Sequence, residues 1–244
     1  GDTNYFNRTY VAWVWKGGGD AVSNTDGSIT SQVSANTDAG FSIVKFDGYQ
    51  SSGTTVGHGL NSTPELIIVK NLDQTTSWPV WFDDAITMTS TTFTLENSTK
   101  YLALNSTTGY IPFTLDKQFG GTLNGGSGDE MIAYCFHSVS GYSKIGSYSG
   151  NSGTNTIYTT DDGTSTGSGG FEPSFVMLKR TNGTGGSWFI YDNRRGSANY
   201  LRPDLSNNEG TDGGVVFNSD GFTINVTYSD HNISGGTYLY MAFK

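Results

Sequence analysis

The stretch Pro64-Glu-Leu-Ile-Ile-Val-Lys70 recurs later in the chain as Pro173-Ser-Phe-Val-Met-Leu-Lys179. Both copies begin with proline, continue as an apolar run and end with lysine. A short run of β-branched, aliphatic and aromatic residues that follows a turn-forming residue is typical of a buried β-strand. Because the same pattern occurs twice, we expect an internal repeat in which each unit contains one copy.

Other stretches are paired in the same order along the chain. The pairs are Gly40–Ser42 with Gly141–Ser143, Trp78–Trp81 with Trp188–Tyr191, Tyr101–Leu102 with Tyr200–Leu201, and Met131–Phe136 with Tyr238–Phe243. The first unit therefore runs over residues 40–139 and the second over residues 141–244. Each unit has the length of one β-sandwich domain or of half of a larger duplicated one, and the sequence alone does not separate the two.

Residues 1–39 precede the two units. Tyr10–Lys16 aligns without a gap with Tyr238–Lys244. We therefore expect a third closing strand at Tyr10–Trp15, followed by a connector. This strand would either be the last strand of a preceding unit in a longer chain or complete one sheet from the other end.

The strand pattern predicts an all-β fold. Besides Tyr10–Trp15, the predicted strands are Phe41–Phe46, Leu66–Lys70, Trp78–Phe82, Thr91–Leu95, Met131–Phe136, Ser143–Tyr148, Phe175–Lys179, Trp188–Asp192, Gly221–Val226 and Tyr238–Phe243. Turn-forming Asp-Gly and Asn-Gly pairs are frequent between them, and no segment shows a convincing helical stripe. We expect two antiparallel β-sandwich-like units of jelly-roll or lectin-like type, without significant helix. The Gly- and Ser-rich run 149–170 is interpreted as a long loop of the second unit.

Composition and charge exclude several classes of function. The chain has 244 residues, a net charge of −9 and no basic cluster larger than a pair such as Arg194-Arg195, so we expect no nucleic-acid partner. Apolar runs such as Leu66–Val69 are far shorter than the roughly 18 residues that a membrane helix needs, so we expect no membrane insertion. Cys135 is the single cysteine, and its alternating apolar position indicates a core residue.

The sequence shows no catalytic or transition-metal motif. His58, His137 and His231 occur singly, and the five glutamates do not form a repeated carboxylate pair of the kind that glycoside hydrolysis needs. We therefore expect a protein that is not an enzyme and needs no cofactor. Calcium stays conceivable because it needs only oxygen ligands. The acidic pairs that could supply them are Asp83-Asp84, Asp129-Glu130 and Asp161-Asp162.

The best candidates for a functional site are aromatic residues with a nearby acid. A flat ring stacks on the C–H face of a sugar, while a carboxylate sorts the hydroxyl groups. The candidate ligand-binding residues are Trp78, Trp81 and Asp83 in the first unit, and Trp188, Tyr191 and Asp192 in the second. The alternative is that these rings belong to the core, as in many sandwiches. Since the two rings of each pair are three residues apart, they point to opposite faces of a strand, and one should lie inside.

Several stretches resemble a known family. They are Tyr10–Gly19, Asn24–Ser31, Asn36–Val44, Thr55–Leu60, Pro64–Lys70, Tyr101–Thr107 and Gly141–Gly150. Together they resemble a β-rich repeat domain found near the C-termini of virion structural and tail-fibre proteins of tailed bacteriophages, many of them marine. No catalytic residue or ligand site of that family can be transferred to this chain.

The resemblance implies a non-enzymatic virion structural protein, such as a tail fibre, head fibre or capsid-decorating protein, that binds the host surface through its loops. It implies a location at the virion surface, contacts with other virion proteins, a homo-oligomer with a trimer favoured, and a host glycan or protein as ligand. One alternative is a secreted or cell-surface carbohydrate-binding module or extracellular structural protein. A polysaccharide depolymerase is less favoured, because no carboxylate pair repeats between the units.

Overall fold

The structure, a computed structural model, describes residues 6–48, 54–75, 78–82, 101–104, 111–112, 128–182 and 186–244. These parts of the chain form strands, turns and extended connections, and they contain no helix. None of the described segments could therefore serve as a helix that crosses a membrane. The predicted fold class, all-β with antiparallel sheets, is confirmed. The predicted strand Thr91–Leu95 lies outside the described residues.

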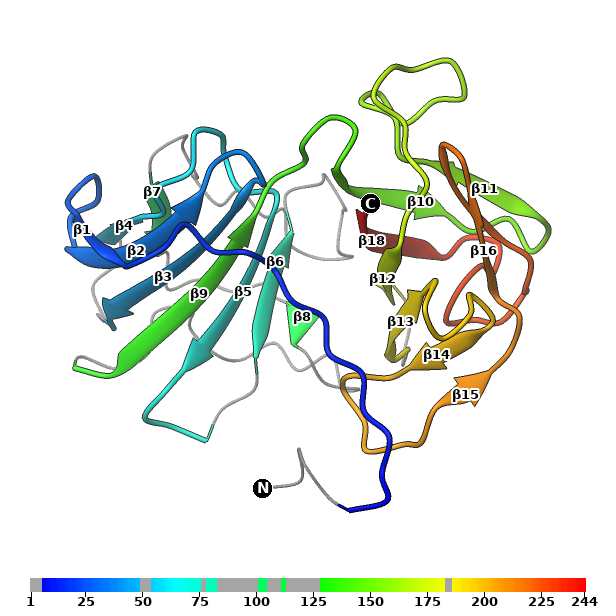
Figure 1. Ribbon diagram of the computed structural model, residues 1–244, viewed down its shortest axis with the longest axis horizontal. Helices are drawn as coiled ribbons and strands as arrows, with labels where there is room; N and C mark the ends of the chain where they lie inside the picture. Colours follow the sequence, from blue (N-terminus) through cyan, green and yellow to red (C-terminus); the bar gives the residue numbers. More distant parts are fainter. Residues whose placement is uncertain are drawn as a thin grey trace.

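Seven antiparallel strands form the first large sheet, in the order β1-β2-β3-β9-β5-β6-β8 (Figure 1). Their bounds are β1 Val22–Asn24, β2 Ser31–Asn36, β3 Phe41–Asp47, β5 Leu66–Asn71, β6 Pro79–Phe82, β8 Ile111–Pro112 and β9 Glu130–Phe136. The central strand β9 pairs with β3 on one edge and with β5 on the other. Strands β1 and β2 lie in the predicted connector, so residues 22–36 extend this sheet.

Six antiparallel strands form the second large sheet, in the order β10-β18-β12-β13-β14-β15. Their bounds are β10 Ser143–Ser149, β12 Phe175–Arg180, β13 Trp188–Asp192, β14 Asn199–Leu201, β15 Gly210–Thr211 and β18 Thr237–Phe243. Here the closing strand β18 pairs with β10 on one edge and β12 on the other. The closing strand of each half is thus an inner strand of its sheet.

Two smaller sheets accompany the large ones. One has three strands, β11 Asn155–Tyr158, β17 Gly221–Ile224 and β16 Val215–Asn218, and the other pairs β4 Thr54–Gly57 with β7 Tyr101–Leu104. The prediction of one long loop over residues 149–170 is therefore wrong at β11. Ile157 of this strand is buried in the core, and that burial stabilises a strand inside a run of turn-forming residues.

The two large sheets share the order of four strands. The order is β3-β9-β5-β6 in the first and β10-β18-β12-β13 in the second. Phe136 pairs with Phe41 and Leu66, while Phe243 pairs with Ser143 and Phe175. An internal repeat predicts this shared strand order. That the two halves are copies of one unit stays a prediction from the sequence.

One predicted sequence pair does not correspond in space. Tyr101–Leu102 lies in β7 and pairs with β4, whereas Tyr200–Leu201 lies in β14 and pairs with β13. The two stretches share residue types but belong to different sheets. A short Tyr-Leu motif specifies a strand without specifying its partner, because strand pairing depends on contacts that are distant in sequence.

A second predicted pair is displaced by one residue. The backbone N–H of His137 donates to the carbonyl of Gly40, and at the matching place the N–H of Lys244 donates to the carbonyl of Tyr142. Gly40 therefore corresponds to Tyr142 rather than to Gly141. The two glycines therefore stand at positions that differ by one residue relative to β3 and β10. Aligning the sequence by its glycines does not detect this shift.

Three apolar cores lie between the sheets. The first joins one face of the first large sheet to β4, and the third joins the second large sheet to the three-stranded sheet. The second core lies between the two large sheets, which stand side by side in Figure 1. Both faces of the second large sheet are thus covered, and all five residues of β13 are buried. Burial of large apolar side chains, at about 1.5–3 kcal/mol each, makes this middle core the main contact between the halves.

The predicted closing strand at Tyr10–Trp15 is wrong. Residues 8–18 are extended but pair with no strand, and we call residues 8–17 the strap. Figure 1 shows the strap as the blue trace that crosses in front of the first large sheet near the gap between the halves. The strands that Tyr10–Lys16 resembles, β9 and β18, already have partners on both edges. The strap therefore makes no ladder hydrogen bonds with these strands, and Trp13 and Trp15 pack against the middle core.

Candidate functional site

The six predicted ligand-binding residues differ in their exposure to solvent. Asp83 lies outside the described residues. Four others are buried, namely Trp81, Trp188, Tyr191 and Asp192. Trp78 is 41% exposed. Buried rings cannot stack on a sugar that approaches from solvent, so among the described candidates only Trp78 keeps the predicted role.

Strand periodicity explains why the aromatic residues of the second half are buried. Along β13, Trp188 and Ile190 face the middle core, whereas Phe189 and Tyr191 face the third core. In a strand whose sheet is covered on both faces, neither parity of side chains reaches solvent. A strand with one covered face would expose one ring of the pair, but both faces of β13 are covered, so the expected exposure of one ring is wrong here.

Asp192 has a structural role. Its Oδ1 accepts hydrogen bonds from the backbone N–H groups of Arg194 and Arg195 at 3.0 and 2.9 Å. Its Oδ2 accepts from Arg195 Nε at 2.8 Å and from Trp13 Nε1 at 3.2 Å. Desolvation raises the pKa of Asp192, but the Arg195 bonds and charge outweigh it and hold this pKa below its ordinary value. The carboxylate is therefore used to fasten the turn after β13 and the strap.

Trp78 and Tyr134 form an aromatic platform on the first large sheet. Trp78 directly precedes β6, and its ring lies nearly parallel to that of Tyr134 in β9, with centroids 6.3 Å apart and an interplanar angle of 14°. Strand β5 lies between them, since Ile68 pairs with both Val80 and Tyr134. The exposed indole is supported from below by the phenol ring. A supported flat ring of this kind can stack on the apolar face of a pyranose.

Lys70 lies beside the platform, in β5. Its ammonium group donates to the carbonyl oxygens of Asn71 at 2.6 Å and Gln74 at 2.9 Å. These bonds hold the turn that follows β5. The described support of the Trp78 ring is its stacking on Tyr134. The sequence gives no signal for Tyr134, because its contact with Trp78 crosses an intervening strand.

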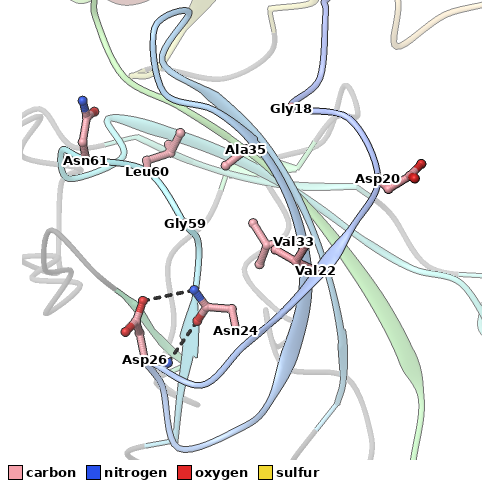
Figure 2. A pocket seen from close by; sticks show the side chains of 10 residues that line it. All are labelled: Gly18, Asp20, Val22, Asn24, Asp26, Val33, Ala35, Gly59, Leu60 and Asn61. Carbon is pink, nitrogen blue, oxygen red and sulfur yellow. Dashed lines mark hydrogen bonds between the residues drawn. The ribbon is translucent and has the colours of Figure 1, made fainter.

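A second candidate is a hollow of about 640 Å³ beside β1 and β2 (Figure 2). Apolar Val33, Ala35 and Leu60 line it together with the polar side chains of Asp20, Asn24, Asp26 and Asn61. No lysine, arginine or aromatic residue is among its lining residues.

The polar groups of the hollow are mostly engaged with one another or turned away. Asn24 Oδ1 accepts from the backbone N–H of Asp26, and Asn24 Nδ2 donates to Asp26 Oδ2, both at 3.0 Å. In Figure 2 the carboxylate of Asp20 points away from the other lining residues. Because few polar groups converge on its centre, the hollow is a weaker candidate than the aromatic platform.

The described residues contain no group of three His, Cys, Asp or Glu side chains that could hold a metal ion. The acidic pairs considered for calcium have other partners. Asp161 accepts the hydroxyls of Ser140 and Ser168, and Asp162 accepts the backbone N–H and hydroxyl of Thr164. Similarly, Asp129 accepts the amide of Asn71, and Glu130 pairs with Lys45. Asp83-Asp84 lies outside the described residues.

A buried polar network lies in the third core. Tyr191 Oη lies 2.6 Å from His231 Nε2 and 3.0 Å from Asp212 Oδ2. Burial, assisted by the positive charge of Arg202, lowers the pKa of His231 to about 3. The neutral imidazole can donate from Nε2 to the Tyr191 oxygen, whose O–H then donates to Asp212. The network is enclosed, so it fixes the loop that contains His231 rather than meeting a ligand.

These features define an all-β protein with two large sheets packed face to face and an aromatic platform on its described surface. The chain belongs to the family described as domain of unknown function DUF7483, which matches residues 1–244. No curated protein and no solved structure matches the chain. The family assignment supplies no activity, so a function has to be argued from the residues themselves.

Proposed function

We propose that this protein is a non-enzymatic structural protein of a bacteriophage virion that also binds a glycan on the host surface. It would be a tail fibre, head fibre or capsid-decorating protein, located at the virion surface and in contact with other virion proteins. The resemblance of Tyr10–Gly19 and Asn24–Ser31 to virion structural proteins supports the first part. A trimer is the favoured assembly, because several weak sites presented together increase avidity.

The observation that carries the adhesion part is the exposed indole of Trp78 stacked on Tyr134. Among the exposed aromatic residues, Trp78 has a flat indole that stacks on a second ring, the arrangement that suits contact with a planar apolar face. Such a surface suits a sugar, whose C–H groups cover the ring while its hydroxyls remain hydrated. The glycan is therefore the favoured ligand over a protein.

The acidic residues support a role without catalysis. Glu65 accepts hydrogen bonds from the backbone N–H and the hydroxyl of Ser138, and Asp192 fastens the turn at Arg195. Asp204 accepts the backbone N–H of Trp188. Carboxylates that stabilise backbone turns are not free to act as a general acid and base across a substrate.

A glycan array with the intact protein tests the adhesion part. We expect binding to at least one host-surface glycan, at least tenfold weaker for Trp78→Ala and partly restored for Trp78→Tyr. Tyr228→Ala, which removes another exposed aromatic side chain, serves as the matched control and should bind like the unchanged protein. Equal binding by Trp78→Ala would refute the platform, and no binding by any form would leave only the structural role.

The virion part is tested by locating the protein. Cryo-electron microscopy of purified phage particles should show the two-sheet density on the particle surface, in symmetric copies. Labelled antibody against the intact protein should mark the same position. Detection on a bacterial cell wall and not on particles would favour the secreted carbohydrate-binding module instead.

A further inference from the structure

Apart from the contacts of Tyr10, the strap and the glycine that follows it make three polar contacts with other described segments. Among the described residues, no backbone-to-backbone hydrogen bond joins residues 6–19 to another segment. Asn36 Nδ2 donates to the carbonyl of Lys16, Ser34 Oγ accepts the N–H of Gly18, and Trp13 Nε1 donates to Asp192. A segment without ladder hydrogen bonds can leave its site without breaking a sheet.

Two indoles of the strap, those of Trp13 and Trp15, pack against the middle core. The Trp15 ring lies edge-on to Phe136, Phe175 and Phe243, with centroid distances of 6.3, 5.5 and 5.6 Å. These three phenylalanines belong to β9, β12 and β18, so Trp15 contacts both large sheets at once. We call the site formed by these phenylalanines and Asp192 the aromatic groove.

Trp13 occupies the second position of the aromatic groove. Its ring lies edge-on to Phe175 at 5.8 Å, and the guanidinium carbon of Arg195 lies 5.7 Å from its ring centroid. Its N–H donates to Asp192, as described above. The groove therefore recognises two tryptophans at alternate positions of an extended chain, one by stacking and one by a polar contact.

Glycines connect the strap to β1. Ser34 fixes Gly18 and Gly19 through its hydroxyl, which accepts the Gly18 N–H and donates to the Gly19 carbonyl. Gly19 has a φ of +98°, a conformation that favours glycine. Gly17 is the last residue of the strap and directly precedes the fixed pair, so it can act as a hinge while the Ser34 contacts persist.

The strap differs in charge and exposure from the rest of the molecule. It contains Arg8 and Lys16 and no acidic residue, whereas the whole chain has a net charge of −9. Its exposed residues also include Tyr10 and the apolar Val14, which is 88% exposed. A basic, partly apolar segment is attracted to the acidic body of another copy as much as to its own.

We propose that the aromatic groove is an interface between copies of this chain, in which the strap of one copy docks into the groove of another. The exchanged strap makes the same contacts as the internal one, so exchange alters only the hinge at Gly17 and the effective concentration. The partner is thus a second copy that supplies Trp13 and Trp15. This proposal does not depend on the glycan ligand.

A peptide experiment tests whether the groove accepts a strap in trans. The probe is a fluorescein-labelled synthetic peptide of residues 6–17, and the receptor is the full chain with Trp13→Ala and Trp15→Ala, which leaves its groove empty. Fluorescence anisotropy should show saturable binding to this variant, at least tenfold weaker binding to the unchanged chain, and none with a peptide that lacks both tryptophans. Absence of saturable binding to the folded variant would overturn the proposal.

A second measurement covers the case in which the double variant does not fold, as judged by circular dichroism. Cys135 is fully buried, so a cysteine introduced by Val14→Cys in one chain and by Asn193→Cys in another can be labelled selectively. After the two full chains are mixed, energy transfer should rise as straps exchange between copies. Absence of energy transfer at all protein concentrations would overturn the proposal.

Discussion

Trp78 and Trp188 occupy matching positions in the two halves but have opposite environments. Both directly precede or begin the strand that pairs with the Pro-initiated strand, β6 in one half and β13 in the other. Trp188 is fully buried in the middle core, whereas Trp78 is 41% exposed on Tyr134. Trp188 lies within β13 in the middle core, whereas Trp78 lies just before the start of β6, where its ring keeps part of its surface in solvent. Position within a strand order therefore does not determine whether a ring is structural or available to a ligand.

The next matched pair, Trp81 and Tyr191, has similar burial but different polar contacts. Trp81 is buried in the first core and Tyr191 in the third, and they pair with Ile67 and Val176 respectively. Tyr191 is linked to a histidine and a carboxylate, whereas Trp81 Nε1 has no hydrogen-bond partner among the described residues. The same strand position thus holds a ring without a hydrogen bond to the described part of the chain in one half and a hydrogen-bonded ring in the other. The hydrogen-bonded ring contacts His231, whose titration makes the stability of the second half depend on pH.

The largest effect is expected from Trp188→Ala. Removing a fully buried tryptophan leaves a cavity between the two large sheets, so the free energy of unfolding should fall by about 3–5 kcal/mol. The matched change, Trp78→Ala, should cost less than about 1 kcal/mol, because its ring is half exposed. Chemical denaturation of both variants measures the difference. Similar losses for the two variants would contradict the contrast between the halves.

His231 predicts a dependence of stability on pH. Its pKa is about 3 in the folded protein against an ordinary value of 6.5, because burial disfavours the charged imidazolium. Between these values the unfolded chain binds a proton that the folded protein does not, so stability falls as the pH decreases from about 6.5 toward 3. The loss by pH 5 should be about 2 kcal/mol.

Urea denaturation at a series of pH values measures this loss. His231→Gln keeps an N–H donor near Tyr191 without the titration, so the difference between this variant and the unchanged protein isolates the contribution of His231. Two parallel pH profiles would show that the imidazole is not held neutral in the folded state.

Tyr191→Phe should have a smaller effect. It keeps the ring in the third core but removes the hydroxyl that joins His231 to Asp212, leaving buried polar atoms without a partner. The expected loss is about 1–2 kcal/mol in thermal or chemical denaturation. Trp81→Phe in the first half removes no hydrogen bond of the described residues and tests packing alone. An unaffected Tyr191→Phe protein would mean that the network adds nothing to the second half.

The sequence was sufficient for the fold class and for most strands of the two large sheets. Apolar runs such as Leu66–Lys70 and Phe175–Lys179 form strands because their composition and flanking turns agree with burial in a sheet. The strap was predicted wrongly for a physical reason. Its alternating pattern is that of a strand, but the closing-strand position of each large sheet is already occupied, by β9 in one and β18 in the other. Occupation of a position in a sheet is a property of the whole fold and leaves no local signal.

The candidate site was less predictable than the fold. Trp78 could be selected as an aromatic residue beside a strand, but its support, Tyr134, lies across an intervening strand. Asp192 could be selected as an acid beside an aromatic residue, but its carboxylate binds the side chains of Arg195 and Trp13. Both outcomes depend on which face of a sheet is covered by the other half. That covering brings together residues that are far apart in the sequence.

The smallest effect, and the one that sharpens the contrast most, is the coupling between Trp78 and Tyr134. A double-mutant cycle with Trp78→Ala, Tyr134→Ala and the double variant should give a coupling free energy of about 0.5–1 kcal/mol, since the two rings stack in the folded protein. The pair Trp78 and Tyr228, whose side chains belong to different halves, provides the control and should be additive. If the first cycle were also additive, the indole would not rest on Tyr134 in solution. A glycan would then have to order the ring as it binds, and the first half would offer a mobile side chain in place of a preformed platform.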